Sequence, residues 1–390
     1  MTSSLLPILI AGGGIGGLAA ALAIARAGMP VVVLEQAPAF AEIGGGIQLA
    51  PNALRVLNRL GVLEAVTAKA VFVDQAVMID ALTGTEITRI ELGEQFVARY
   101  GHRYLVVHRQ DLLEALLAEC RNTYGIDLRV NARIESFGQR DDRVSVKCRD
   151  GKLLEGHALI GADGLWSVVR AQMFADGAPR FSGHICYRGV VPMDQIPDRS
   201  YGNAMALWVG PNVHLVQYPI RNGELMNNVA VIVSQEYRRG EPNYGGWNEV
   251  ETLFATVHPK VQAMLAFIDR GQRWLLHDRD PIPNWSIGRA TLLGDAAHPT
   301  LQNMAQGACM ALEDAVELAD QVARHPNHPE SAFVAYQQAR YIRTARVQLS
   351  ARFVAQMVHL GGGARDVRNA VLSTRDPTST FELDWLYRQA

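Results

Sequence analysis

The feature that most constrains this chain is a glycine-rich turn close to its start. Gly12, Gly14 and Gly17 follow the spacing G-x-G-x-x-G between an apolar run at 7–11 and a helical pattern at 18–27. Glycines at this spacing permit a tight turn, close approach of the backbone to a pyrophosphate, and packing of a helix on a strand. The free N–H groups at the start of such a helix attract an anion. The sequence therefore predicts a strand–turn–helix unit that binds a dinucleotide.

An acidic residue stands where such a unit places its ribose contact. The apolar run 31–34 is predicted to be the second strand, and Glu35 ends it eighteen positions after the last glycine of the motif. A carboxylate there accepts hydrogen bonds from ribose hydroxyls, in FAD and NAD alike. We expect Ile15, Gly16 and Gln36 to complete the cofactor contacts of this segment. The alternative is a glycine-rich turn without a ligand.

Composition and charge narrow the class of protein. The chain carries 37 Lys and Arg against 39 Asp and Glu, and this balance argues against a nucleic-acid-binding protein. Its four cysteines lie far apart, and no His and Cys cluster has zinc-ligand spacing, so we expect no metal and a reducing, cytoplasmic location. The uncharged first 25 residues lack the positive start of a signal peptide, and no run is long enough to predict a transmembrane segment.

The rest of the chain alternates between two kinds of pattern. From about 181 to 274, short runs of alternating apolar and polar residues predict a mostly antiparallel sheet. The clearest of these runs are 204–209, 214–219 and 228–233. At 290–293 the chain returns to a buried strand followed by a glycine turn and a helix, and late helices are expected over about 330–360. These patterns predict an α/β protein with a second, sheet-rich lobe.

Two further motifs combine an acid with a glycine after a strand. One is 162–167, which contains Asp163, and the other is 293–299, which contains Asp295. Ligands collect at the carboxyl ends of strands in open α/β sheets, so a carboxylate at 295 can accept a hydrogen bond from a ribityl hydroxyl. Gly307 lets the start of the next helix approach a ring carbonyl or a phosphate. The ordinary alternative is that both acids cap helices or turns.

These three motifs, in their order and spacing, resemble the single-component FAD-dependent aromatic hydroxylases over nearly the whole chain. Within that family the sequence is most similar to the enzymes that act on 3-hydroxybenzoate, followed by the 6-hydroxynicotinate and salicylate hydroxylases. The resemblance implies a Rossmann-type FAD-binding domain, a mostly antiparallel substrate-binding β lobe, and a C-terminal helical segment. The expected boundaries are 1–75, 99–178 and 279–350 for the FAD domain, 76–98 and 179–278 for the lobe, and 351–390 for the helical segment.

Matching positions assign the cofactor contacts that the resemblance implies. They are Gly12, Gly14, Gly17 and Glu35 on the adenosine side, Gly46, Ile47 and Gln48 in a loop near the flavin, Arg109 near the diphosphate and ribityl chain, Asp163 for FAD and nicotinamide, Asp295 at the ribityl chain, and Gly307 with Ala308 beside the flavin. The family holds FAD tightly and uses NADH and O2 as transient co-substrates. A surface position beside a helix is the alternative for Arg109.

The family's chemistry implies a base beside the substrate. A C4a-hydroperoxide of the flavin delivers oxygen to an electron-rich ring, and a phenolate is far more reactive than a phenol. His214, Val216 and Tyr218 fall on one face of the predicted strand at 214–219. The resemblance makes His214 the base, with Tyr218 and Gln302 holding the phenolic oxygen. From the residues alone, a hydrogen bond on the sheet face would be the ordinary explanation for His214.

The implied activity is NADH- and O2-dependent hydroxylation of 3-hydroxybenzoate para to its hydroxyl, giving 2,5-dihydroxybenzoate. The alternatives are a salicylate-type or other hydroxybenzoate hydroxylase, and a flavin-binding partner protein that does not hydroxylate. Gln48 departs from the histidine of the hydroxynicotinate enzymes, which argues against that substrate. Arg188 is a candidate for the substrate carboxylate or, equally, for a structural ion pair. The expected partner is a small aromatic acid, and the family favours a homodimer.

Overall fold

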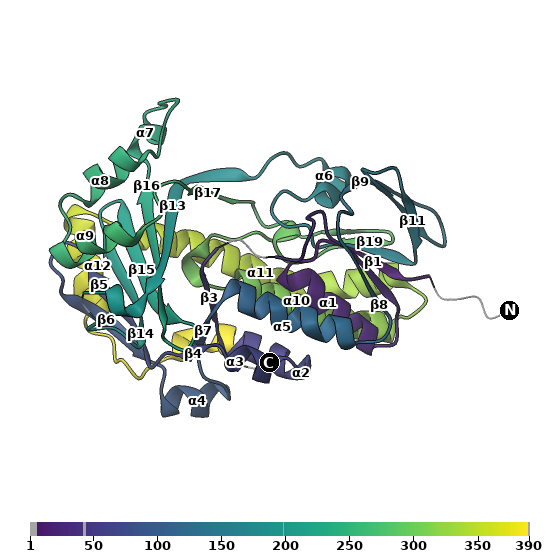
Figure 1. Ribbon diagram of the computed structural model, residues 1–390, viewed down its shortest axis with the longest axis horizontal. Helices are drawn as coiled ribbons and strands as arrows, with labels where there is room; N and C mark the ends of the chain where they lie inside the picture. Colours follow the sequence, from purple (N-terminus) through teal and green to yellow (C-terminus); the bar gives the residue numbers. More distant parts are fainter. Residues whose placement is uncertain (1–5, 42–43, 198, 389–390) are drawn as a thin grey trace.

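The computed structural model describes residues 6–41, 44–197 and 199–388 of the chain. Figure 1 shows two parts side by side, each built around its own large sheet, with one long helix running lengthwise between them. This arrangement agrees with the expected α/β fold, in which a nucleotide-binding domain adjoins a sheet-rich lobe. No helix among the described ranges is long and apolar enough to cross a membrane.

The first part contains a six-stranded sheet that is parallel except at one edge. Its order is β18 (Ser286–Ile287), β19 (Ala290–Leu292), β12 (Ala158–Gly161), β1 (Ile8–Ala11), β2 (Val31–Leu34) and β8 (Ile126–Arg129), with only β18 antiparallel to its neighbour. The helices α1 (Ile15–Arg26), α5 (Arg109–Asn122) and α10 (Gly307–Arg324) lie together beside it (Figure 1). Strands β1, β2, β12 and β19 are wholly buried, as expected for parallel strands covered on both faces.

The glycine turn begins helix α1 three residues earlier than the sequence pattern indicates, at Ile15 instead of residue 18. Gly17 therefore lies within the first turns of the helix, and a Cβ atom there would stand 2.0 Å from the carbonyl oxygen of Gly12. Gly12 itself has a φ of +103°, a backbone conformation that is strained for any residue with a side chain. The motif thus encodes both the bend and the close packing of the helix on β1.

The second part is a seven-stranded sheet. Its order is β17 (Arg273–Asp278), β13 (Arg180–Pro192), β16 (Leu225–Val233), β15 (Val213–Ile220), β14 (Ala204–Gly210), β5 (Gln75–Asp80) and β6 (Glu86–Glu91). Every neighbouring pair is antiparallel except β14 with β5. The expected mostly antiparallel lobe is confirmed. Its strands come from two separated stretches of chain, whereas the domain boundaries given above stay a prediction.

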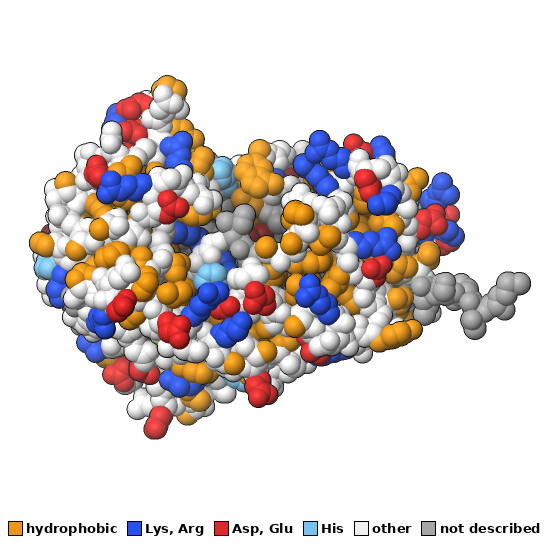
Figure 2. All heavy atoms as spheres, viewed as in Figure 1, with side chains coloured by type: hydrophobic (Ala, Val, Ile, Leu, Met, Phe, Trp, Pro, Cys, Tyr) orange, Lys and Arg blue, Asp and Glu red, His pale blue; other side chains and the backbone are white. Residues whose placement is uncertain are grey.

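The long helix α11 (Pro329–Val358) connects the two parts and continues unbroken across the boundary expected at 350/351. The shorter helices α12 (Gly362–Leu372) and α13 (Asp384–Tyr387) follow it. The remaining elements are α2 (Pro51–Arg59), α3 (Leu63–Thr67), α4 (Glu94–Tyr100), α6 (Val168–Phe174), α7 (Gln235–Arg238), α8 (Trp247–Phe254), α9 (Pro259–Met264), β3 (Gly46–Leu49), β4 (Val71–Phe72), β7 (Leu105–His108), β9 (Ile134–Gln139), β10 (Val144–Cys148) and β11 (Leu153–Gly156). On the face shown in Figure 2, acidic and basic side chains are interspersed.

Candidate active site

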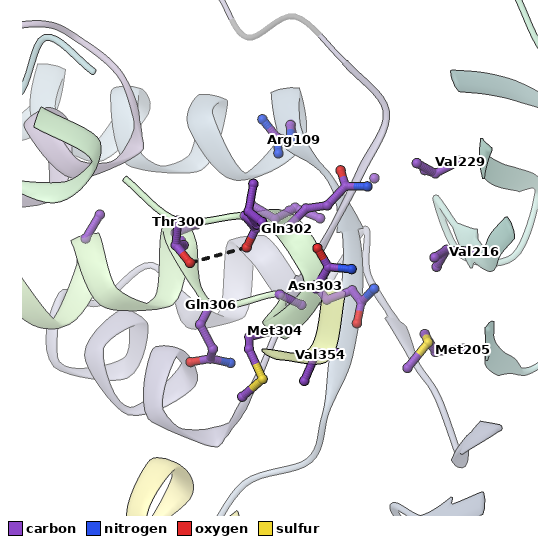
Figure 3. A pocket seen from close by; sticks show the side chains of 18 of the residues that line it. Arg109, Met205, Val216, Val229, Thr300, Gln302, Asn303, Met304, Gln306 and Val354 are labelled. Atoms are coloured by element: carbon purple, nitrogen blue, oxygen red, sulfur yellow. Dashed lines mark hydrogen bonds between the residues drawn. The ribbon is translucent and has the colours of Figure 1, made fainter. Parts of the chain in front are cut away.

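A cavity of about 510 Å³ lies between the two parts, and residues of both line it. One end is formed by the start of helix α1 and by the loop 293–308, and the other end by strands of the seven-stranded sheet. Figure 3 shows this second wall, where Met205, Val216 and Val229 stand opposite Gln302 and Asn303 of the loop. The volume is in the usual range for a cofactor or small-molecule site.

The start of helix α1 supplies the anion-binding end of the cavity. Gly14 is its N-cap and offers no side chain to the free N–H groups, and Gly14, Ile15 and Gly16 all line the cavity. Glu35 accepts hydrogen bonds from the backbone N–H groups of Gly13 and Ala37, both at 2.8 Å. These bonds hold the acid beside the glycine turn, at the end of β2.

Other members of the adenosine-side set shape the turn instead of facing the cavity. Gly12 and Gly17 pack against each other, and Gln36 is exposed next to Glu35. Their contact with a cofactor stays a prediction.

Arg109 and Asp295 both line the cavity. Asp295 follows β19, and burial raises the pKa of its carboxyl, an effect that the nearby His298 and Arg109 oppose. Arg109 begins helix α5, and its buried Nε has no hydrogen-bond partner among the described residues. A buried guanidinium nitrogen that lacks a partner is costly and suits an anionic ligand. Gly307 and Ala308 line the same region at the start of α10.

Asp163 occupies a different kind of position. Its Oδ1 accepts a hydrogen bond from the Ser167 hydroxyl at 2.5 Å, and its Oδ2 accepts bonds from the N–H groups of Val168 and Val169 at 2.8 and 3.2 Å. The carboxylate therefore holds the start of helix α6, which was the ordinary alternative, and Gly164 lines the cavity instead. A direct cofactor contact by Asp163 stays a prediction.

The residues at this end fit FAD. The uncapped helix start suits a pyrophosphate, Glu35 suits a ribose, and the unpartnered Nε of Arg109 suits a diphosphate or a flavin oxygen. Gly46, Ile47 and Gln48, expected in a loop near the flavin, belong to strand β3 instead, which pairs with β7. Only a glycine fits at its start, because a Cβ on Gly46 would lie 2.3 Å from the Tyr218 ring. Ile47 and Gln48 line the cavity next to it.

The substrate end is mainly apolar, with a few polar groups. His214, Val216 and Tyr218 of β15 all line the cavity, whereas Leu215 belongs to the core on the other face. Gln302 approaches from the loop, and its Oε1 accepts a hydrogen bond from Arg188 Nη2 at 3.4 Å. The structure thus brings the three expected catalytic side chains to one cavity.

Several of the polar groups at the substrate end of the cavity are uncharged hydroxyl and amide groups. Burial raises the pKa of Tyr218 to about 12, so its hydroxyl keeps its proton near neutral pH. The Tyr104 hydroxyl donates to Gln48 Oε1 at 2.7 Å, and burial also raises the pKa of Tyr104. Tyr104 was missed by the sequence analysis, because it stands in no motif and reaches the cavity only through the pairing of β7 with β3.

His214 is buried, and its Nδ1 lies 2.8 Å from Nε2 of His359, the residue that immediately follows helix α11. Burial and the neighbouring His184 lower the pKa of His214 to about 3, well under the ordinary value assumed from the sequence. His214 is therefore neutral throughout the physiological pH range. It keeps a lone pair for a hydrogen-bond donor, while burial disfavours its protonated form unless a negative charge lies beside it. The sequence analysis missed His359, since a histidine after a helix carries no recognisable signal.

The buried histidines make a testable prediction about stability. Burial lowers the pKa of both His214 and His359, with His184 and Arg238 adding to the effect, while in the unfolded chain each titrates near 6.5. As pH falls below about 6.5, the unfolded state binds protons that the folded state rejects, so between pH 6.5 and 5 the free energy of unfolding should fall by about 2 kcal/mol per pH unit from these two residues. Urea unfolding between pH 6.5 and 5 measures this slope.

The matched control is the double variant His214→Gln/His359→Gln, which removes both titrating groups. Its slope should be lower by about 2 kcal/mol per pH unit over the same range. Equal slopes in the two proteins would show that both imidazoles are accessible to protons in the folded state.

Comparison with known proteins supports the cofactor assignment. A family model described as an FAD binding domain matches residues 6–349. Among solved structures, that of Klebsiella pneumoniae HpxO complexed with FAD and uric acid superposes with a TM-score of 0.82 at 25% identity, and the match covers 95% of this chain and 93% of that one.

Curated relatives narrow the class further. The 3-hydroxybenzoate 6-hydroxylase of Polaromonas naphthalenivorans (strain CJ2) is 44% identical over 383 residues, covering 98% of this chain and 96% of that protein. The protein of the same name from Klebsiella oxytoca is 40% identical over 380 residues, covering 97% and 96%. The chain therefore belongs to the FAD-dependent aromatic monooxygenases. Within that class it is similar, over nearly its full length, to 3-hydroxybenzoate 6-hydroxylases.

Proposed function

We propose that this enzyme hydroxylates 3-hydroxybenzoate para to its hydroxyl group, consuming NADH, O2 and a proton and forming 2,5-dihydroxybenzoate, NAD⁺ and water. The observation that carries the proposal is a neutral, buried His214 in a mainly apolar cavity that also holds Tyr218 and Gln302. The names of the similar proteins support the choice of substrate and position.

The cofactor would be held by the start of helix α1, Arg109, Asp295 and the start of helix α10. When bound and reduced by NADH, FAD supplies the electrons that activate O2, of which one atom enters the ring and the other leaves as water. The protein's own contribution is to bind both molecules, exclude water and manage a proton at the substrate hydroxyl.

The proton step is where the residues of this chain act. The phenolic O–H bond breaks and its proton passes to His214, and the resulting phenolate carries added electron density at its ortho and para carbons. Tyr218, protonated because burial raises its pKa to about 12, donates a hydrogen bond to the phenolate oxygen. Gln302 can donate to the same oxygen through its amide. Apolar side chains such as Met205 and Val216 keep water from the ring.

The positive charge of two arginines in the cavity favours binding of negatively charged ligands. Arg109 and Arg188 are the arginines that line it within the described ranges, and each has a buried Nε without a hydrogen-bond partner there. Two phosphates of FAD and the carboxylate of an aromatic acid are both suited to such groups. We propose Arg188, which is next to Gln302, for the substrate carboxylate.

Turnover with a panel of acids tests the proposal. The FAD-loaded enzyme is given NADH with 3-hydroxybenzoate, salicylate or 4-hydroxybenzoate, and each product is identified. We expect 2,5-dihydroxybenzoate from 3-hydroxybenzoate, with NADH consumed in equal amount, and little product from the other two. Product from a different acid would change the substrate and keep the chemistry. If no acid accelerates NADH consumption, the protein is better described as a flavin-binding partner without hydroxylase activity.

Location and assembly also belong to this proposal. All four cysteines are buried free thiols, which suits a reducing compartment, and we place the enzyme in the cytoplasm.

We also propose a homodimer. Exposed apolar side chains on helix α11, namely Ile342, Leu349 and Phe353, are consistent with an interface on that helix. Light scattering of the holoenzyme gives the mass directly.

A further inference from the structure

Two buried histidines from distant parts of the chain form a hydrogen-bonded pair at the edge of the cavity. His214 lies on β15, and His359 immediately follows helix α11, 145 positions later. His214 Nδ1 and His359 Nε2 are 2.8 Å apart, and His359 Nδ1 is 2.6 Å from the carbonyl oxygen of Ala355. The backbone of His359 also contacts the turn between β14 and β15, because its carbonyl oxygen accepts a hydrogen bond from the Asn212 N–H at 3.2 Å.

The chemistry of these groups fixes where the protons are. A carbonyl oxygen only accepts, so His359 Nδ1 carries the hydrogen that points to Ala355. A neutral His359 then has a lone pair at Nε2, and the short contact requires His214 to donate from Nδ1. The proton of neutral His214 is therefore on Nδ1, and its Nε2 is left with a free lone pair. Since His214 lines the cavity, that lone pair is the acceptor that a substrate hydroxyl can meet.

We propose that His359 is a positioning residue for the hydroxylation, which holds His214 in the tautomer whose Nε2 accepts the phenolic proton. The inference rests on the proposed function for the identity of the reaction, while the tautomer itself is a property of the free protein. When the phenolic O–H bond breaks, its proton binds His214 Nε2. His214 becomes an imidazolium, and its Nδ1–H bond to His359 strengthens as the donor becomes charged.

The surroundings of His359 favour this role. It stands at the C-terminal end of a 30-residue helix, where the helix dipole presents partial negative charge that stabilises a nearby cation. The charged or titratable groups around the pair are His184, whose ring lies 5.0 Å from His359, and Arg238. The buried His214 and the partly buried His184 both favour the neutral state of His359, which keeps its Nε2 free to accept.

Nuclear magnetic resonance of the ¹⁵N-histidine-labelled holoenzyme tests the tautomer without turnover. The His214 signals are assigned by their loss in His214→Gln. We expect the Nδ1–H tautomer in the wild type and in His359→Gln, whose amide oxygen can still accept the bond. In His359→Leu, which offers no acceptor, we expect His214 to shift toward the Nε2–H tautomer. His184→Gln is the matched control, because it changes a neighbouring histidine without touching this hydrogen bond, and it should leave the tautomer as in the wild type.

Turnover of the same variants tests the consequence. We expect His359→Leu to lower product formation by about tenfold to a hundredfold, the effect of losing one hydrogen bond to a charged group, with more hydrogen peroxide per NADH and an unchanged KM for the acid. His359→Gln should restore most of the rate. An Nδ1–H tautomer that persists in His359→Leu overturns the proposal, as does a glutamine variant that is as slow as the leucine one. The tautomer result stands whichever acid is the substrate, so its failure is distinct from failure of the proposed reaction.

Discussion

Replacing His214 with alanine should lower the rate of hydroxylation by about 10²–10⁴-fold, the usual contribution of a general base. His214 is the one neutral nitrogen base in the cavity among the described residues that line it, and without it the substrate enters as a phenol with a less reactive ring. NADH should still be consumed, because the cofactor end of the cavity is unchanged, but most of the oxygen should leave as hydrogen peroxide. The ratio of 2,5-dihydroxybenzoate to NADH, measured with peroxide released, gives the effect.

Two checks separate a lost base from general damage. The FAD content of His214→Ala should equal that of the wild type, since His214 lies on β15 and not among the predicted cofactor contacts. His184→Gln is the control for disturbance of a partly buried imidazole in the same lobe. An alanine variant that couples NADH to product as well as the wild type would remove His214 from the mechanism.

Replacing Asp314 with alanine should lower the free energy of unfolding by about 3–5 kcal/mol, the cost of breaking a buried ion pair. Asp314 of helix α10 accepts from Arg340 Nε at 2.7 Å, from His298 Nε2 at 2.6 Å and from the Gly294 N–H at 3.1 Å. Although its burial opposes ionisation, His298 and Arg340 lower the pKa of Asp314 to about 2. Without the carboxylate, the buried Arg340 keeps only Glu313 as a charge partner, and the His298 ring and the Gly294 N–H lose their acceptor.

Urea unfolding at pH 7 measures this loss. Asp320→Ala is the matched control, because Asp320 lies on the same helix and its ion pair with Arg59 is partly exposed, so the expected loss there is under about 1 kcal/mol. Since the Asp314 pKa is lowered on folding, its stabilisation is present above about pH 4 and is lost as pH falls toward 2. If Asp314→Ala and Asp320→Ala lowered the free energy of unfolding equally at pH 7, the buried ion pair would contribute no more stability than the exposed one. The FAD content of Asp314→Ala should also fall, because Gly294 precedes Asp295 in the cavity wall.

The parts of this structure that the sequence predicts well are local patterns. The glycine turn encodes its own geometry, because positions 12 and 17 are in steric contact where no larger residue fits. The alternation in β15 likewise places His214, Val216 and Tyr218 on the cavity side, since side chains of a strand point to alternate faces.

What the sequence does not reveal depends on packing between distant segments. His359 meets His214 only because helix α11 ends against the turn between β14 and β15. The pKa of His214 differs from the ordinary value for the same reason, as burial is a property of the assembled lobe. Asp163 shows the opposite case, where a motif residue has a local capping role that the sequence leaves as one of two explanations.

Helix α11 imposes a rule on how this protein can change over evolutionary time. Arg340 near its middle supports the wall that carries Asp295, and His359 just beyond its end holds the proposed base. Each residue of an α-helix advances by about 1.5 Å and turns by about 100°. One inserted or deleted residue between these two positions would therefore swing His359 away from His214 while Arg340 stayed in place. The number of residues between Arg340 and His359 is therefore fixed by two contacts at once, one that supports the cofactor end of the cavity and one that positions the base at the substrate end.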